Sequence, residues 1–125
     1  MIIHESAEDY LETILVLKER KGVVRSIDIA RELNFSKPSV SVAMKKLREN
    51  GYLEVDEEGY ITLLPPGAEI AQRIYTRHRL LTRFLEGLGV SPKNAAADAC
   101  KIEHDSSAES FERIVSCAKA RGLLD

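Results

Sequence analysis

Two short helical patterns, joined by a two-residue turn and followed at once by a hairpin pattern, limit most strongly how this chain can fold. Apolar residues recur at helical spacing over 27–33 and over 36–49, and residues 34–35 form the turn between them. Two short strands are predicted at 52–55 and 60–63, because a glycine-containing loop between apolar runs favours a hairpin. This order of elements predicts a winged helix-turn-helix.

Further helical patterns precede and follow this module. One spans about residues 5–21, and after the hairpin come three more, over about 68–88, 91–104 and 106–122. Proline and glycine at the junctions support these limits, because Pro suits a first helical turn and Gly a helix end. Three serines, Ser26, Ser36 and Ser106, are expected to cap the helices that follow them. We therefore expect a mainly α protein. Its winged helix-turn-helix, three helices plus a β-hairpin, would occupy residues 1–64, and a helical domain would occupy residues 65–125.

The composition is that of an ordinary globular protein. The 125 residues are 44% hydrophobic and 30% charged, which argues against a disordered chain. No apolar run is long enough for a membrane span, and the N-terminus lacks the pattern of a signal peptide. The two cysteines, Cys100 and Cys117, are too few for a disulfide framework. We therefore expect a cytoplasmic protein with no membrane partner and no organic cofactor.

Positive charge is concentrated around the second of the two short helices. Residues 25–48 contain six basic and two acidic residues, a balance of +4, whereas residues 1–64 contain nine basic and twelve acidic residues, a balance of −3. Such a local patch suits a helix laid in the major groove of double-stranded DNA. The acidic loop at 56–58 would repel phosphate, so we expect the wing to contribute little. The candidate DNA-binding residues are Arg25, Ser36, Lys37, Pro38, Ser39, Ser41, Lys45 and Lys46.

Potential metal ligands recur at helical spacing in three parts of the chain. They are Asp9 and Glu12, three residues apart, then His78 within the long helix, and Cys100, Glu103 and His104 at i, i+3 and i+4. The last three lie on one face of a helix, and carboxylate, imidazole and thiolate groups can bind a divalent first-row transition metal. Each residue also has an ordinary explanation in a solvated face or a core. Spacing alone therefore leaves a metal site and a plain helix surface both open.

Four stretches carry a likeness to a known family. They are Ala7-Glu8-Asp9-Tyr10-Leu11-Glu12-Thr13-Ile14, the helix-turn-helix over 27–41, Arg77-His78-Arg79-Leu80-Leu81 and Cys100-Lys101-Ile102-Glu103-His104. In this order and spacing they resemble the DtxR/MntR family of iron-dependent and manganese-dependent repressors. Many regulators share the helix-turn-helix, whereas the Cys-x-x-Glu-His segment combined with Arg-His-Arg-Leu is far more specific.

The resemblance implies a homodimeric, metal-activated transcriptional repressor in the short form that lacks an SH3-like domain. Its first module would bind a palindromic operator, and its second would hold the metal and the dimer interface. The implied ligands are Asp9, Glu12, His78, Cys100, Glu103 and His104, and the candidates for the dimer interface are Leu80, Leu81, Phe84, Leu85 and Leu88.

The implied metal is Fe²⁺ or Mn²⁺, because the ligand set mixes two branches of the family. A thiolate at position 100 is typical of the iron-responsive branch, and Asp9 with Glu12 is typical of the manganese-responsive branch. Hard oxygen ligands favour Mn²⁺, whereas the thiolate and imidazoles favour Fe²⁺ and, in vitro, Co²⁺, Ni²⁺ or Zn²⁺. On balance the donor set favours Fe²⁺.

Three other classes of protein remain as alternatives. The first is a metal-independent winged-helix regulator, whose DNA binding would survive a chelator. The second is an interaction module that does not use its winged helix for DNA. The third is a metallohydrolase, but the sequence offers no general base or nucleophile outside the ligands themselves, so we do not expect an enzyme.

Overall fold

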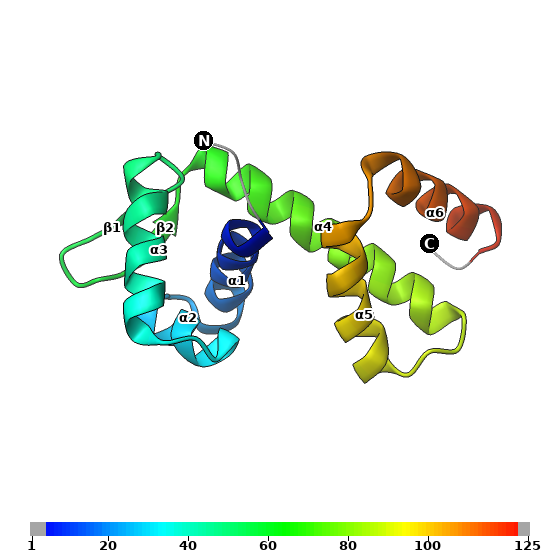
Figure 1. Cartoon of the computed structure of the whole chain (residues 1–125), viewed down its shortest axis with the longest axis horizontal. Helices are drawn as coiled ribbons and strands as arrows, with labels where there is room; N and C mark the ends of the chain where they lie inside the picture. Colours follow the sequence, from blue (N-terminus) through cyan, green and yellow to red (C-terminus); the bar gives the residue numbers. More distant parts are fainter. Residues whose placement is uncertain (1–4, 123–125) are drawn as a thin grey trace. The chain divides into compact units, whose positions relative to one another are not determined.

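A computed structural model describes residues 5–122, without the side chains of Glu5 and His104. In this part of the chain six helices and one two-stranded hairpin follow one another in the predicted order, which confirms the mainly α fold class (Figure 1). The elements are α1 Glu5–Lys21, α2 Ser26–Leu33, α3 Lys37–Glu49, β1 Leu53–Val55, β2 Ile61–Leu63, α4 Pro65–Gly87, α5 Pro92–Asp105 and α6 Ala108–Ala120. No helix among these is both long and apolar enough to cross a membrane.

The chain forms two compact units that divide between Arg73 and Ile74, within α4. The predicted boundary between residues 64 and 65 coincides instead with the start of α4. The first turns of α4 belong to the first unit because Ala71 is part of the core of that unit and Ile70 packs against it. Because α4 is continuous across the division, its helical sequence pattern gives no sign of where the two units meet.

The first unit has one core, built mainly by α1, α2, α3 and the hairpin. Its most deeply buried side chains come from every one of these elements, for example Leu11, Ile29, Val40, Leu53 and Ile61. α3 packs on α2, because the apolar face of α3 joins the same cluster as the buried residues of α2. This packing leaves the opposite face of α3 open to solvent.

Hydrogen bonds to side chains determine where the helices of the first unit begin. Ser36 caps α3 as predicted, since its Oγ accepts the backbone N–H of the residue three positions on, at 3.3 Å. The prediction that Ser26 caps α2 is wrong, because α2 already includes Ser26. Instead, the Asp28 carboxylate accepts the backbone N–H of Arg25 at 2.9 Å and an N–H of Lys21 at 2.7 Å. The hydrogen bond from Lys21, with that from Arg25, lowers the pKa of Asp28 below its usual 3.8.

The hairpin is short and ends in a tightly hydrogen-bonded loop. Its strands are antiparallel, with Leu53 opposite Leu63 and Val55 opposite Ile61. In the loop, Asp56 Oδ1 accepts the backbone N–H groups of the residues two and four positions on, at 3.0 and 2.9 Å. The loop therefore uses one of its three carboxylates to hold its own backbone.

The second unit consists of α4 from Ile74 onward, α5 and α6, and it buries few large side chains. Ile74 and Leu81 are buried, whereas the other buried apolar residues of this unit are alanines. Ser107, rather than the predicted Ser106, caps α6 by accepting a backbone N–H at 3.1 Å. Several large apolar side chains stay half-buried, namely Leu80, Phe84, Leu85, Ile102, Phe111, Ile114 and Val115. The unit therefore presents apolar surface that another copy of the chain can cover.

Candidate metal centre and nucleic-acid interface

Three predicted ligands from two helices come together in the second unit. His78 of α4 and Cys100 and Glu103 of α5 each offer one ligand atom, and these atoms all lie within 4.8 Å of one another. Within this trio, Nδ1 of His78 lies 3.7 Å from Oε2 of Glu103. The structure therefore unites residues from two of the three parts of the sequence that carried potential ligands.

The trio is largely shielded from water. Glu103 is 2% exposed, while the side chain of His78 is 27% exposed and Cys100 is half-buried. A carboxylate at this depth is costly to hold unless positive charge lies close to it. The neighbouring imidazole can supply such charge when it is protonated, and a bound cation supplies more.

The geometry and chemistry of the trio fit a divalent metal ion. Donor atoms that share one ion at about 2.0–2.3 Å lie about 3–4.5 Å from each other. The 3.7 Å separation of Nδ1 and Oε2 falls in this range, and the 4.8 Å limit lies just outside it. One imidazole, one thiolate and one carboxylate form a donor set suited to first-row transition metals such as Fe²⁺.

The remaining predicted ligands lie elsewhere in the chain. Asp9 and Glu12 are half-buried on α1, one helical turn apart, and belong to the first unit. The side chain of His104 lies outside the described part of the structure, although α5 includes this residue. The trio therefore accounts for half of the predicted ligand set.

The exposed face of α3 is basic and rich in hydroxyl groups. Its predicted DNA-binding residues, namely Lys37, Pro38, Ser39, Ser41, Lys45 and Lys46, are all exposed. None of the three lysines forms an ion pair with a carboxylate in residues 5–122. Their charge is therefore available to a phosphate backbone.

The acidic residues near this face are neutralised from α1. Glu32 pairs with Arg20 at 3.4 Å, and Asp28 pairs with Lys21 at 2.7 Å. Both acidic residues of the stretch 25–48 are thus balanced by cations from outside it. The positive charge counted from the sequence therefore remains on α3 and its flanks.

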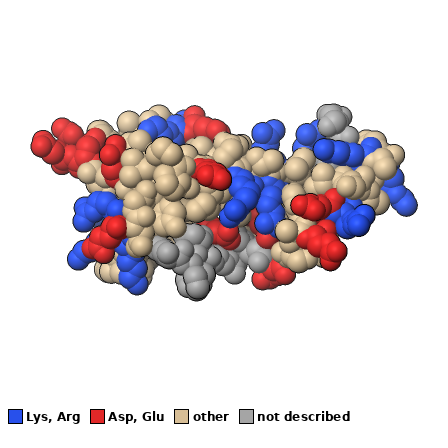
Figure 2. All heavy atoms as spheres, turned by 90° about the horizontal axis from the view of Figure 1, so that it is seen from above, with Lys and Arg blue, Asp and Glu red and all other residues tan. Residues whose placement is uncertain are grey.

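The other predicted contacts with DNA also lie at the surface. Ser36 is exposed, and its hydroxyl donates to Oγ of Ser39 at 2.8 Å while it caps α3. The guanidinium of Arg25 lies 4.4 Å from the centroid of the Tyr60 ring, which holds this cation against the hairpin. Figure 2 shows acidic side chains gathered at the end where Figure 1 has the β1–β2 loop.

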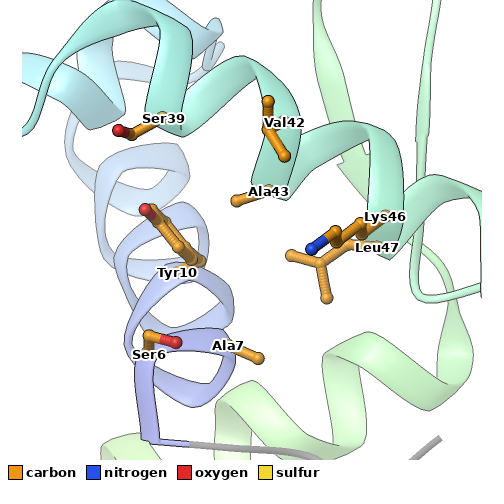
Figure 3. A pocket seen from close by; sticks show the side chains of 8 residues that line it. All are labelled: Ser6, Ala7, Tyr10, Ser39, Val42, Ala43, Lys46 and Leu47. Carbon is orange, nitrogen blue, oxygen red and sulfur yellow. The ribbon is translucent and has the colours of Figure 1, made fainter.

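A pocket of about 310 Å³ lies between α1 and α3 in the first unit (Figure 3). It is lined by Ser6, Ala7, Tyr10, Ser39, Val42, Ala43, Lys46 and Leu47. Burial raises the pKa of Tyr10, and the adjacent Asp9 carboxylate raises it further. Val42 was not among the predicted DNA-binding residues, and it is 54% exposed. Its position on the helix, on the side opposite the buried residues, is the sequence signal that could have shown that it is exposed.

The candidates for the dimer interface differ in exposure. Leu81 is 1% exposed and belongs to the core of its own unit. Leu80, Phe84 and Leu85 are half-buried, and Leu88 is 59% exposed at the end of α4. The accessible candidates are therefore the four other than Leu81.

Two family models match the chain, and the second begins at the start of α4. The iron dependent repressor N-terminal DNA binding domain matches residues 3–61, and the iron dependent repressor metal binding and dimerisation domain matches residues 65–119. The chain is also 40% identical over 109 residues to the HTH-type transcriptional regulator MntR of Geobacillus kaustophilus, and this match covers 87% of the chain and 77% of that relative.

Solved structures of metal-dependent regulators share the fold. T. acidophilum IdeR matches with a TM-score of 0.79 and 29% identity, over 98% of this chain and 55% of that one. A manganese-dependent transcriptional repressor in complex with manganese matches with a TM-score of 0.81 and 29% identity, over 94% of this chain and 53% of that one. The chain thus spans about half the length of these two proteins.

These likenesses decide between the classes considered from the sequence. The first matched domain is a DNA-binding domain, and the second is a metal-binding and dimerisation domain. The relatives are transcriptional regulators rather than enzymes. They do not favour a metal-independent regulator, and they support iron or manganese as the metal. The chain belongs to the DtxR/MntR family of iron- and manganese-dependent transcriptional repressors.

Proposed function

We propose that this chain is a metal-activated repressor whose ion, bound by His78, Cys100 and Glu103, prepares the first unit to bind a palindromic operator. The observation that carries this proposal is the trio itself, in which ligand atoms from two helices lie within 4.8 Å of one another. The exposed lysines of α3 support the DNA-binding half of the proposal.

Asp9, Glu12 and His104 complete the ligand set in this proposal. Asp9 and Glu12 belong to α1, which also packs in the core beneath the DNA-binding helix. Because the ligands come from both units, metal binding is coupled to the placement of α3. When no cation is bound, the carboxylates repel one another, and so does the thiol once it is ionised, which favours separation of the units. A bound ion supplies the positive charge that offsets this repulsion.

The donor set favours Fe²⁺ while still accepting Mn²⁺. The carboxylates of Asp9, Glu12 and Glu103 are hard ligands that suit Mn²⁺. The thiolate of Cys100 and the imidazole of His78 are softer and raise the affinity for Fe²⁺, and for Co²⁺, Ni²⁺ or Zn²⁺ in vitro. Since a thiolate ligand must stay reduced and the DNA partner is intracellular, we place the protein in the cytoplasm.

Dimerisation gives the operator its symmetry. The half-buried and exposed apolar residues of the second unit, with Leu80, Phe84, Leu85 and Leu88 as candidates, would form the interface between two copies. Two copies of α3 then read equivalent half-sites, separated by about 34–36 Å or a multiple of it on B-DNA. A two-fold dimer of this kind binds a palindrome.

Metal-dependent DNA binding tests the proposal directly. A duplex is first selected from a random library with the full chain and Mn²⁺, or anaerobic Fe²⁺, and its affinity is then measured by fluorescence anisotropy with metal or with EDTA. We expect EDTA to abolish tight binding, and Glu103→Ala and His104→Ala to remove the metal stimulation while the fold remains. Unchanged stimulation in both variants contradicts the site, and binding that survives EDTA favours the metal-independent alternative.

A further inference from the structure

Val42 is unusual among the exposed residues of this chain. Among the residues that the structure describes, four large hydrophobic side chains are exposed, and Val42, at 54%, is the one that lies within a helix or strand. The other three, Val23, Phe35 and Leu88, lie in the connections between elements. A β-branched residue is not a strong helix former, so local folding gives no reason for a valine here.

The position of Val42 on α3 directs it away from the core. It follows the fully buried Val40 by two residues, which turns it about 200° around the helix axis. Pro38 lies one turn before it and Lys45 one turn after it, and both are exposed. Figure 3 shows Val42 at the rim of the pocket, on the same stretch of α3 as Lys46. The outward face of α3 therefore has an apolar centre framed by cations.

We propose that Val42 recognises the methyl group of a thymine in each half-site of the operator, an inference that rests on the proposed DNA-binding function. In the major groove the thymine C5-methyl is the apolar group that a base edge presents to a protein. Lysine contacts to phosphates position a helix on the duplex but carry no sequence information. Val42 has no hydrogen-bonding side-chain group, so it discriminates by packing on the methyl and by leaving polar base edges without a partner.

The test replaces thymine by deoxyuridine, which keeps every hydrogen-bonding group of the base and removes the methyl. The probe is a duplex selected from a random library with the Mn²⁺-loaded full chain, and each thymine is replaced in turn while Kd is measured by anisotropy. The lost burial of one methyl predicts about fourfold weaker binding per half-site, and about fifteenfold when both half-sites are changed. The Val42→Ala variant should bind the thymine duplex more weakly than the wild type, to a similar extent. It should bind the duplex with deoxyuridine in both half-sites as tightly as the wild type does.

Val23→Ala is the matched control, because Val23 is 50% exposed and lies outside α3, in the connection between α1 and α2. It should bind both duplexes as the wild type does. The inference is overturned if Val42→Ala loses the same factor on both duplexes, if Val42→Ala binds like the wild type, or if no single deoxyuridine weakens binding. If the wild-type chain with metal enriches no sequence, the proposed DNA-binding function itself fails, and that outcome is visible before any variant is made.

Discussion

Replacing Glu103 by glutamine probes the metal centre with the least change in shape. Glu103 is 2% exposed, and its Oε2 lies 3.7 Å from Nδ1 of His78. Glutamine occupies nearly the same volume, and a neutral amide is easier to bury than a carboxylate. The metal-free variant should therefore fold and melt at the temperature of the metal-free wild type or above it.

The expected effect on the metal-bound protein follows from linkage. A metal at about 100 times its Kd stabilises the wild type by about 2.7 kcal/mol, or about 10 °C in Tm for a chain of this length. Removing a residue that merely hydrogen-bonds to a metal ligand weakens metal binding about 10–100-fold. Loss of the charge on a ligand should cost at least 100-fold, which leaves about 0.4 kcal/mol of stabilisation at the same metal concentration.

Differential scanning calorimetry in EDTA and in Mn²⁺ measures this shift. Asp105→Asn is the matched control, because Asp105 is an exposed carboxylate two residues further along α5 and should keep the wild-type shift. A wild-type shift in Glu103→Gln would show that the buried carboxylate does not bind the ion, and the reasoning would be wrong.

Four further predictions concern other parts of the molecule. Lys37→Ala should weaken DNA binding and reduce the slope of log K against log salt by about 1 per half-site, about 2 for the dimer, while calorimetry on the protein alone shows unchanged metal affinity. Cys100→Ser should weaken Co²⁺ and Fe²⁺ binding more than Mn²⁺ binding, with loss of the thiolate-to-Co²⁺ absorption band in the near ultraviolet. Gly67→Ala should destabilise the first unit by about 2 kcal/mol or more in urea unfolding, because its Cβ would overlap the backbone carbonyl of Tyr52. The pKa of Asp28 is lowered in the folded state, so the ionised Asp28 carboxylate stabilises the fold fully above pH 3.8. This stabilisation disappears as the pH falls through the folded-state pKa, and Asp28→Asn should flatten this part of the curve of unfolding free energy against pH.

The order of the elements could be predicted because every junction carries a local signal. Helical spacing, capping residues and turn residues act over a few positions and are visible in the sequence alone. The errors arise where neighbouring signals compete. Ser26 is a good capping residue, but the Asp28 carboxylate bonds to the N–H of Arg25 and moves the start of α2 one residue earlier. Likewise Ser107 takes the role expected of Ser106.

The metal centre was only partly predictable from spacing. Helical periodicity places Cys100 and Glu103 on one face of α5, but it does not show that His78 of α4 meets them. That encounter depends on how two helices pack, and the sequence supported it through the family resemblance. Val42 was missed for a related reason, because an apolar residue in a helix suggests a core and only its phase against Val40 places it outside.

Thermodynamic linkage between metal and DNA tests the central claim most directly. Isothermal titration calorimetry gives the metal Kd of the wild-type chain alone and in the presence of saturating selected duplex, and anisotropy gives the DNA Kd with metal and with EDTA. If ligands from both units couple the ion to the position of α3, DNA should tighten metal binding, and the product of the factors for all ions of the dimer should equal the factor by which metal tightens DNA binding. Equal metal affinity with and without DNA would contradict the account.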